Sequence, residues 1–348
     1  MRLSDPSDLP TDFGPTVVTL GNFDGVHRGH AAVIAELHEQ AAKHDAKTVA
    51  VTFDPHPLAV LHPDRAPELL TGLEDRLYLL EQRGLDAVVV MPFTRELAAE
   101  TPREFVEGTF VDALGARAVV VGKDTRFGIK NSGDIDTLRE LGQEFGFDVV
   151  ALDDVGPGVR WSSTQVRELL AAGKVDEAAD VLGRHHCVVG EVVKGFQRGR
   201  ELGFPTANLA RDADGVVPAD GVYAGWLVRR ELPQDHPEYR LPAAISVGTN
   251  PTFDIPERTV EAYVLDRDDL ELYGERVAIE FVDRLRGNVK FDSIDELIEQ
   301  MHADEAQARR GNEQAEVEVR EVAQAPTASF TSSQGQGVRR RRRRASAR

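Results

Sequence analysis

Two histidines three residues apart, His27 and His30, directly follow a run of strand-forming residues, 17–20. If a helix begins near His27, both imidazoles lie on its first turn and face the same side. Such a pair can bind a metal ion, donate hydrogen bonds to phosphate oxygens, or be purely structural. A metal site needs further ligands in a fixed arrangement. His56 and His62 offer no recognisable spacing, so phosphate binding is the favoured chemistry.

The glycines of the same string, GNFDGVHRGH over 21–30, suit a phosphate site. Gly21 and Gly25 allow tight turns, and Gly29 allows the backbone to approach a ligand closely. The amide groups and the positive dipole end of a helix that begins here would point at the site, which favours anions. The string therefore predicts a phosphate-binding turn between a strand and a helix.

The first half of the chain alternates short apolar runs with helical patterns. Such continuous runs between helices are typical of parallel strands that are covered on both faces. We therefore predict an α/β domain with a doubly wound parallel sheet and right-handed connections. Its strands are expected at 17–20, 48–53, 87–90, 118–121 and 148–152.

Polar residues and glycines follow each of these predicted strands. Because ligands bind beyond the carboxyl ends of the strands in an open parallel sheet, the segments that follow the strands should meet at one rim. These segments are 21–30, 54–57, 92–95, 122–128 and 160–167. This rim is the predicted site of the N-terminal half.

Near residue 185 the pattern changes to short strands separated by Gly- and Pro-rich turns, which is typical of an antiparallel barrel or sandwich. An amphipathic helix should follow from about Ser293, a suitable N-cap, to about Arg309. The polar end of the chain indicates disorder. The barrel strands are expected at 188–193, 221–228, 243–247, 259–265 and 277–282, and the domains at 1–183 and 184–312, with a disordered tail at 313–348.

The second half has its own glycine-rich, basic segment, GFQRGRELGFPTAN over 195–208. It again suits phosphate and a metal ion, although a glycine-rich loop alone is weak evidence for either.

The string over 21–30 resembles the G-x-F-D-x-x-H-x-G-H signature of the HxGH nucleotidyltransferases, which have a Rossmann-like fold. The strings VTFDPHP, GKDTRFG and WSSTQVR are similar to those of one family within it, the prokaryotic bifunctional FAD synthetases. GRELGFPTAN resembles that family's flavokinase signature. The resemblance covers roughly residues 15–310. It implies a C-terminal barrel that phosphorylates riboflavin to FMN with ATP, and an N-terminal domain that adenylylates FMN to FAD and releases pyrophosphate.

For adenylyl transfer, the resemblance implies that the FMN phosphate is itself the nucleophile and that the protein supplies alignment and charge stabilisation. His27 and His30 would contact the ATP phosphates as catalytic donors. Ser163, Thr164 and Arg167 would hold the β- and γ-phosphates from the opposite side. The other ATP- and phosphate-binding positions that carry over are Gly21, Phe23, Asp24, Gly29 and Asp124.

For the kinase, the resemblance implies a base near the riboflavin 5′-hydroxyl and a Mg²⁺ ion that bridges the phosphates. Glu261 takes the place of the catalytic glutamate, and the preceding VGTNPTF matches a family turn. Thr206 and Asn208 would bind the Mg²⁺–nucleotide. The last helix, with Gln300 and Asp304, would lie beside the flavin site. The flavin- and ATP-binding positions that carry over are Gly195, Arg198, Gly199, Gly203, Pro205, Thr206 and Asn208.

Three residues depart from the family pattern. Thr125 stands where an aromatic residue is usual, which would alter stacking on the flavin or the adenine. Trp161 replaces a small aliphatic residue and would reshape the pocket floor. Asn288 stands where a glutamate is usual, so it is not assigned to catalysis. The changes at Thr125 and Asn288 leave a rival hypothesis open, in which the chain is an adenylyltransferase whose barrel only senses flavin.

The composition narrows the remaining choices. The single cysteine, Cys187, excludes an intrachain disulfide and fits a reducing compartment. The polar N-terminus does not resemble a signal peptide, and no apolar stretch is long enough for a transmembrane helix. We therefore expect a cytoplasmic enzyme without a membrane partner. Its partners should be ATP, riboflavin and FMN, and homo-oligomerisation is left open.

The charge is distributed unevenly along the chain. Residues 339–344 and Arg348 are arginines, and without these seven the net charge falls from −18 to −25. Such an acidic body repels nucleic acid, so we expect no specific nucleic-acid partner. A rival hypothesis of non-specific, salt-sensitive nucleic-acid binding is confined to this arginine tail. The acidity fits a salt-rich cytoplasm and simple compositional drift equally well.

Overall fold

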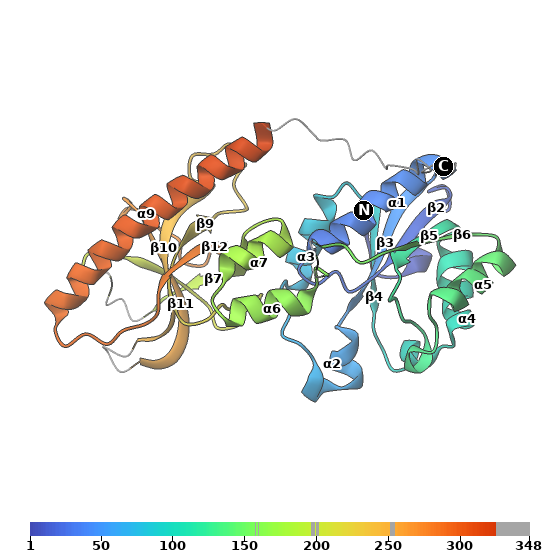
Figure 1. Ribbon diagram of the computed structural model, residues 1–348, viewed down its shortest axis with the longest axis horizontal. Helices are drawn as coiled ribbons and strands as arrows, with labels where there is room; N and C mark the ends of the chain where they lie inside the picture. The colour runs from blue at the N-terminus through green and yellow to red at the C-terminus, as the bar shows by residue number, and fades with distance from the viewer. Residues whose placement is uncertain (157, 159, 196–198, 200–201, 251–254, 325–348) are drawn as a thin grey trace, which may run out of the picture.

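The first half of the chain forms a parallel sheet in the computed structural model (Figure 1). Its strands lie in the order β1-β4-β3-β2-β5-β6, and every pair is parallel. β2 neighbours β5 because the chain reverses its direction of winding there, and a crevice for ligands is expected at such a point. The predicted doubly wound sheet is confirmed. The strands are β1 (Arg2–Leu3), β2 (Thr16–Leu20), β3 (Lys47–Asp54), β4 (Ala87–Pro92), β5 (Ala116–Gly122) and β6 (Asp148–Leu152).

The structure describes residues 1–156, 158, 160–195, 199, 202–250 and 255–324. The helices of the first half are α1 (Arg28–His44), α2 (Pro57–Leu61), α3 (Leu73–Glu81), α4 (Pro102–Phe105), α5 (Ile135–Phe145), α6 (Ser163–Ala171) and α7 (Val175–Leu182). Shorter helical segments are η1 (Pro6–Asp8), η2 (Pro63–Arg65), η3 (Leu97–Ala99), η4 (Val106–Ala113) and η5 (Ile129–Asn131).

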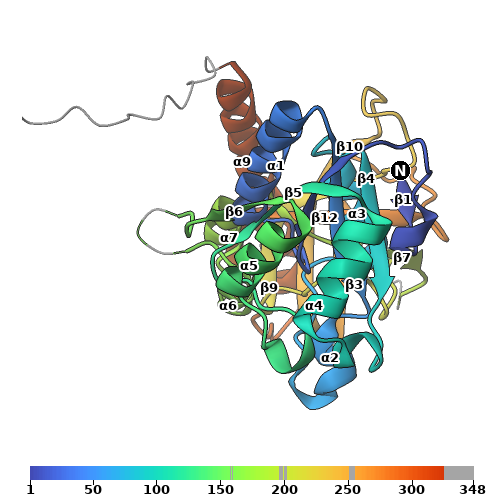
Figure 2. The same cartoon turned by 90° about the vertical axis from the view of Figure 1, so that its right-hand side faces the viewer.

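Helices cover both faces of the sheet, as the two views in Figures 1 and 2 show. Successive residues of a strand point to opposite faces. Val17 therefore packs in the cluster that contains Ile34 of α1 and Leu80 of α3. Its neighbour Val18 packs in the cluster that contains Leu138 of α5. This two-sided burial is why the strands are largely apolar.

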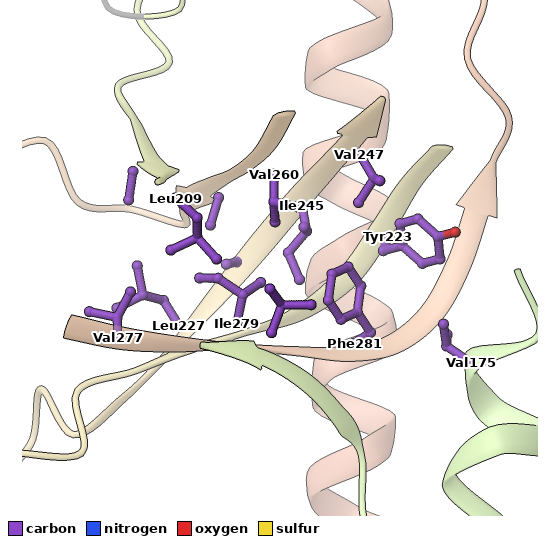
Figure 3. Packing of buried hydrophobic residues seen from close by; sticks show 14 of the residues in the cluster. Val175, Leu209, Tyr223, Leu227, Ile245, Val247, Val260, Val277, Ile279 and Phe281 are labelled. Atoms are coloured by element: carbon purple, nitrogen blue, oxygen red, sulfur yellow. The ribbon is translucent and has the colours of Figure 1, made fainter. Parts of the chain in front are cut away.

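The second half forms a closed antiparallel barrel in the order β10-β11-β8-β7-β12-β9, which confirms the predicted barrel. Its interior is filled by aromatic and branched side chains such as Tyr223, Ile245 and Phe281 (Figure 3). The strand β8 was not expected, because its sequence follows a glycine-rich segment. The strands are β7 (His186–Val193), β8 (Thr206–Leu209), β9 (Gly221–Val228), β10 (Arg240–Asn250), β11 (Ile255–Val264) and β12 (Arg276–Arg286).

One long helix, α9 (Ile294–Gln324), lies along the barrel (Figure 1). It was expected to end near Arg309 but continues to Gln324, so residues 313–324 of the predicted tail are helical. Residues 325–348 lie outside the described part of the chain. Gly311 lets the helix approach β9, because a Cβ there would lie 3.0 Å from the Cβ of Ala224. Among the described residues, no helix combines the length and apolarity needed to cross a bilayer.

The helices α6 and α7 connect the sheet to the barrel. Leu170, Val175 and Leu182 share one buried cluster with Tyr223 and Phe281 of the barrel. Because the two helices pack on the barrel while they belong to the predicted N-terminal domain, the boundary at residues 183 and 184 stays a prediction.

A buried polar cluster also joins the two halves. The guanidinium of Arg230, which follows β9, pairs with the carboxylate of Asp75 on α3 and lies over the ring of Tyr78. Its Nη2 is also 3.3 Å from Sγ of Cys187 on β7. Burial raises the pKa of the Cys187 thiol to about 12. Because the thiolate is the reactive form, the thiol should be inert while this interface is closed.

Replacing Arg230 by methionine should expose this thiol. The change leaves Asp75 buried without its charged partner, which costs about 3–5 kcal/mol. We therefore expect Cys187 to react with a thiol reagent at pH 8 many times faster in Arg230→Met than in the wild type. Arg229→Met is the matched control, because Arg229 pairs with Glu238 and Glu275 of the barrel instead. Equal reaction rates in all three proteins would contradict the role given to Arg230.

Candidate active sites

The turn after β2 places the first site. Phe23, Gly25 and Val26 all have positive φ angles, of 49°, 79° and 38°. The amide of Gly25 donates to Oγ1 of Thr71 at 3.2 Å. A side chain at Gly25 would also meet Leu70 at 2.8 Å. This tight turn delivers the chain to the N-terminus of α1, at the point where the winding of the sheet reverses.

The two histidines stack on each other at this helix start. Their ring centroids are 3.7 Å apart, and the ring of Phe23 lies edge-on to His30. His27 is the N-cap of α1, and its Nδ1 accepts a hydrogen bond from the amide of His30 at 3.3 Å. A neutral imidazole with Nδ1 as acceptor has its proton on Nε2, which is then a donor. A Cβ at Gly29 would lie 2.9 Å from the His27 ring, so this packing requires glycine.

The surroundings of the pair suit an anion. Burial, and then the positive charges of Arg160 and Arg184, lower the pKa of His27 to about 4. The pKa of His30 is also lowered well below its usual value, chiefly by burial. The first turn of α1 contains no acidic side chain that would occupy the positive end of the helix. Within the described part of the chain, no three His, Cys, Asp or Glu side chains gather to hold a metal ion.

The lowered pKa of His27 predicts how stability depends on pH. The unfolded chain takes up a proton at His27 below about pH 6.5, whereas the folded protein does so only near pH 4. His27 therefore leaves stability unaffected above pH 6.5 and reduces it as the pH falls towards 4, by about 3 kcal/mol in all. Urea unfolding at pH 7 and pH 4.5 should show a smaller loss of stability for His27→Gln than for the wild type. An equal loss would contradict the pKa of His27.

The start of α6 faces the histidine turn. Arg167 pairs with the buried carboxylate of Asp24, and its Nε donates to the carbonyl of Glu68 at 2.7 Å. Ser163 Oγ donates to the backbone carbonyl of Asp24 at 2.8 Å. Ser163 and Arg167 therefore brace the turn after β2, although about 140 residues separate them from it. Thr164, the third residue predicted from this string, is exposed.

Two further predicted residues lie at the edge of this site. Asp124 is exposed and pairs with Arg160. Trp161 places its backbone carbonyl beside Gly29, and Arg28 lies over its ring with a distance of 5.6 Å to the centroid. The backbone amide of Thr125 donates to the carbonyl of Gly122 at 3.0 Å, which closes a short turn.

The sequence reasoning missed one residue of this site, Arg76. The residue is 1 % exposed, and its guanidinium donates to the carbonyls of Asn22 and Phe53, both at 3.0 Å. It thereby ties the turn after β2 to the end of β3. The available signal was its position on α3, because Arg76 falls on the same helix face as Leu73, Leu77 and Leu80.

The second site lies on β8 and β11 of the barrel, which pair with Glu261 opposite Asn208. Thr206 Oγ1 donates to Oε2 of Glu261 at 3.1 Å. Asn208 Nδ2 donates to Oγ1 of Thr206, also at 3.1 Å. Thr259 Oγ1 donates to Oε1 of Glu261 at 3.1 Å. The structure therefore brings together the three predicted residues and adds Thr259, which the sequence reasoning did not select.

Three described glycines of the glycine-rich segment lie in tight surroundings or an unusual backbone conformation near this cluster. A Cβ at Gly195 would overlap the amide group of Asn208, and one at Gly199 would overlap the carbonyl of Phe204. Gly203 has a φ angle of +88°. A cavity of about 60 Å³ adjoins the cluster, and its lining includes Gly195, Pro205, Thr206, Asn208 and Arg267. Arg198 lies outside the described residues.

The helix α9 packs against β9, β10 and β12 along the barrel. Asp304 accepts hydrogen bonds from Arg286 on β12, at 2.6 to 3.1 Å, and from Gln300 at 2.9 Å. Asn288 donates through Nδ2 to the carbonyl of Val247 at 3.0 Å, so in this chain it supports the end of β10.

The structure thus joins a parallel α/β sheet to a closed barrel that has its own hydroxyl, amide and carboxylate cluster, and its relatives are transferases. The FAD synthetase family model matches residues 9–165, and the riboflavin kinase model matches residues 182–311. The chain belongs to the family of bifunctional riboflavin kinase/FMN adenylyltransferases.

Its similarity to proteins of this name extends over most of its length. The protein from Escherichia coli K12 is 37 % identical over 294 residues, which are 84 % of this chain and 91 % of that one. The protein from Listeria monocytogenes is 36 % identical over 296 residues, with the same coverage. A crystal structure of a Streptococcus pneumoniae protein, described as a macrolide-efflux protein, is 32 % identical. It superposes with a TM-score of 0.77 over 89 % of this chain and 98 % of that one.

Proposed function

We propose that the barrel transfers the γ-phosphoryl group of ATP to riboflavin, and that the N-terminal domain then transfers AMP from a second ATP to the resulting FMN. The supporting observation is that each family match contains its own polar site, one at His27 and His30 and one at Thr206, Asn208 and Glu261. We place both reactions in the cytoplasm, where the buried thiol of Cys187 would stay reduced.

In the N-terminal domain, an oxygen of the FMN phosphate attacks the α-phosphorus of ATP. The bond from that phosphorus to the bridging oxygen breaks, and pyrophosphate leaves. His27 donates its Nε2 proton as a hydrogen bond to the phosphates, and His30 stands beside it. These donors and the amides of α1 stabilise the charge that moves onto the leaving group. Arg167 uses Nε and Nη2 to bind Glu68 and Asp24. Its Nη1 has no hydrogen-bond partner among the described residues and could donate to a phosphate oxygen.

The second site fits a Mg²⁺ ion. Its donors are a hydroxyl, an amide oxygen and a carboxylate, the oxygen ligands that Mg²⁺ prefers. The Nδ2 of Asn208 is turned towards Thr206, so its Oδ1 faces the other way, towards Gly195. Thr206 and Asn208 would hold the ion with the nucleotide. When bound, Mg²⁺ would neutralise charge on the phosphates of ATP.

In the barrel, the 5′-oxygen of riboflavin attacks the γ-phosphorus of ATP, and the bond to the bridging oxygen of ADP breaks. The proton of the hydroxyl passes to the carboxylate of Glu261. An ionised carboxylate only accepts hydrogen bonds, so it can orient this hydroxyl before it takes the proton.

Product analysis tests the proposal. The purified full chain, incubated with riboflavin, ATP and MgCl₂, should form FMN and then FAD, which chromatography separates. With FMN in place of riboflavin it should release pyrophosphate and FAD together. If FAD forms from FMN but no FMN forms from riboflavin, the barrel is a flavin sensor and the kinase assignment is wrong.

A further inference from the structure

Both oxygens of the Glu261 carboxylate are held by threonine hydroxyls. Thr206 on β8 donates to Oε2, and Thr259 on β11 donates to Oε1, each at 3.1 Å. Thr259 lies two residues before Glu261 on the same strand, so their side chains project from the same face of the barrel wall. Before substrate binds, the carboxylate is therefore clamped from two strands.

The hydroxyls of Thr206 and Thr259 would have different roles in the reaction. Thr206 would bind the Mg²⁺–nucleotide, and it already accepts a hydrogen bond from Asn208 at 3.1 Å. The proton of Thr206 points to Oε2 and one of its lone pairs accepts from Asn208, so its second lone pair would serve the ion and the hydroxyl is shared between the nucleotide and the carboxylate. Oε2 keeps a further lone pair with which it can receive the riboflavin hydroxyl.

Thr259 has no such competing role. Its other contact is the carbonyl of Gly248, at a longer distance of 3.4 Å. The single proton of this hydroxyl is better used on Oε1, because a charged acceptor makes the stronger hydrogen bond. Thr259 can therefore act on the carboxylate alone, whereas Thr206 would also serve the nucleotide.

We propose that Thr259 is a positioning residue for the kinase reaction. Its hydroxyl anchors Oε1 of Glu261 so that Oε2 faces the 5′-hydroxyl of riboflavin, and it does not itself touch the substrate. This inference rests on the proposed role of Glu261 as the base. A carboxylate without the anchor would rotate, and fewer encounters would have the geometry for proton transfer.

The test is a pair of substitutions at Thr259. Thr259→Val keeps the shape and the β-branched side chain that suits a strand but removes the hydroxyl. We expect kcat for FMN formation to fall about tenfold, with the KM values for riboflavin and ATP changed less than about twofold. Thr259→Ser keeps the hydroxyl and should restore most of kcat. FAD formation from FMN by the same proteins should be unchanged, and recovery of kcat in Thr259→Ser with unchanged KM values shows that the barrel tolerates substitution at this position.

Ser246→Ala is the matched control. Ser246 lies opposite Glu261 across the β10–β11 pair, but among the described contacts it makes no hydrogen bond to the carboxylate. It should behave as the wild type. A normal kcat in Thr259→Val, a raised KM for ATP alone, or a Ser variant as slow as the Val variant would each overturn the positioning role. If Glu261→Ala still forms FMN, the proposed function itself fails, which is a separate result.

Discussion

Replacing His30 by alanine should lower FAD formation from FMN and ATP by about a hundredfold or more, the usual cost of removing one donor to a developing charge. The change removes an imidazole at the start of α1 and the ring on which His27 stacks at 3.7 Å. FMN formation should stay close to the wild-type rate, because the Glu261 cluster belongs to a different domain. Initial rates of FMN and FAD formation, measured separately by chromatography, check both expectations.

His44→Ala is the matched control for this experiment. His44 ends the same helix, and its ring is 3.3 Å from the carboxylate of Asp148 at the far end from the site. Both activities should survive this change. If His30→Ala abolished both activities in a folded protein, the assignment of two separate sites would be wrong. If it changed neither, the pair would have no part in phosphate chemistry.

The strands of the first half were predictable because each is buried on both faces. Such burial requires a continuous apolar run, which can be recognised in a short segment of sequence. A run such as AVVV at 87–90 is typical of a strand that is buried on both faces in a covered parallel sheet. The position of the histidine turn follows, since it comes directly after one of these strands. The bracing of Asp24 by Ser163 and Arg167 is different. The sequence placed them at the same rim, but it cannot say which partners pair across it.

The second site depended on information that is not local. The glycines and Pro205 that precede the TANL segment are typical of a loop, so the strand β8 that this segment forms was not predicted. Its pairing with β11 sets Asn208 opposite Glu261, and register between strands so far apart is decided by packing of the whole barrel. The family resemblance identified Thr206, Asn208 and Glu261, but the pairing of β8 with β11 was needed to show which of them are in contact. Thr259 was identified only from its contact with Glu261 in the structure.

Replacing Glu261 by alanine should have the reverse effect of the change at His30. FMN formation from riboflavin should fall by orders of magnitude, because the 5′-hydroxyl loses the group that we propose takes its proton. FAD formation from supplied FMN should stay near the wild-type rate. Glu261→Gln sharpens the test. It keeps the size of the side chain, and its single amide oxygen can still accept from one of the two threonines, but its NH2 group cannot accept and the amide does not act as a base.

Glu191→Gln provides the control for the glutamine substitution, because Glu191 is an exposed glutamate on β7 of the same barrel. It should leave both activities intact. A Glu261→Gln variant that forms FMN as fast as the wild type would reduce Glu261 to a hydrogen-bonding role, and the proton would then have to leave by another route. If Gln is inactive and Ala is inactive while FAD formation persists in both, the deficit is specific to the proton acceptor. Together with the opposite pattern at His30, that result would assign one reaction to each domain.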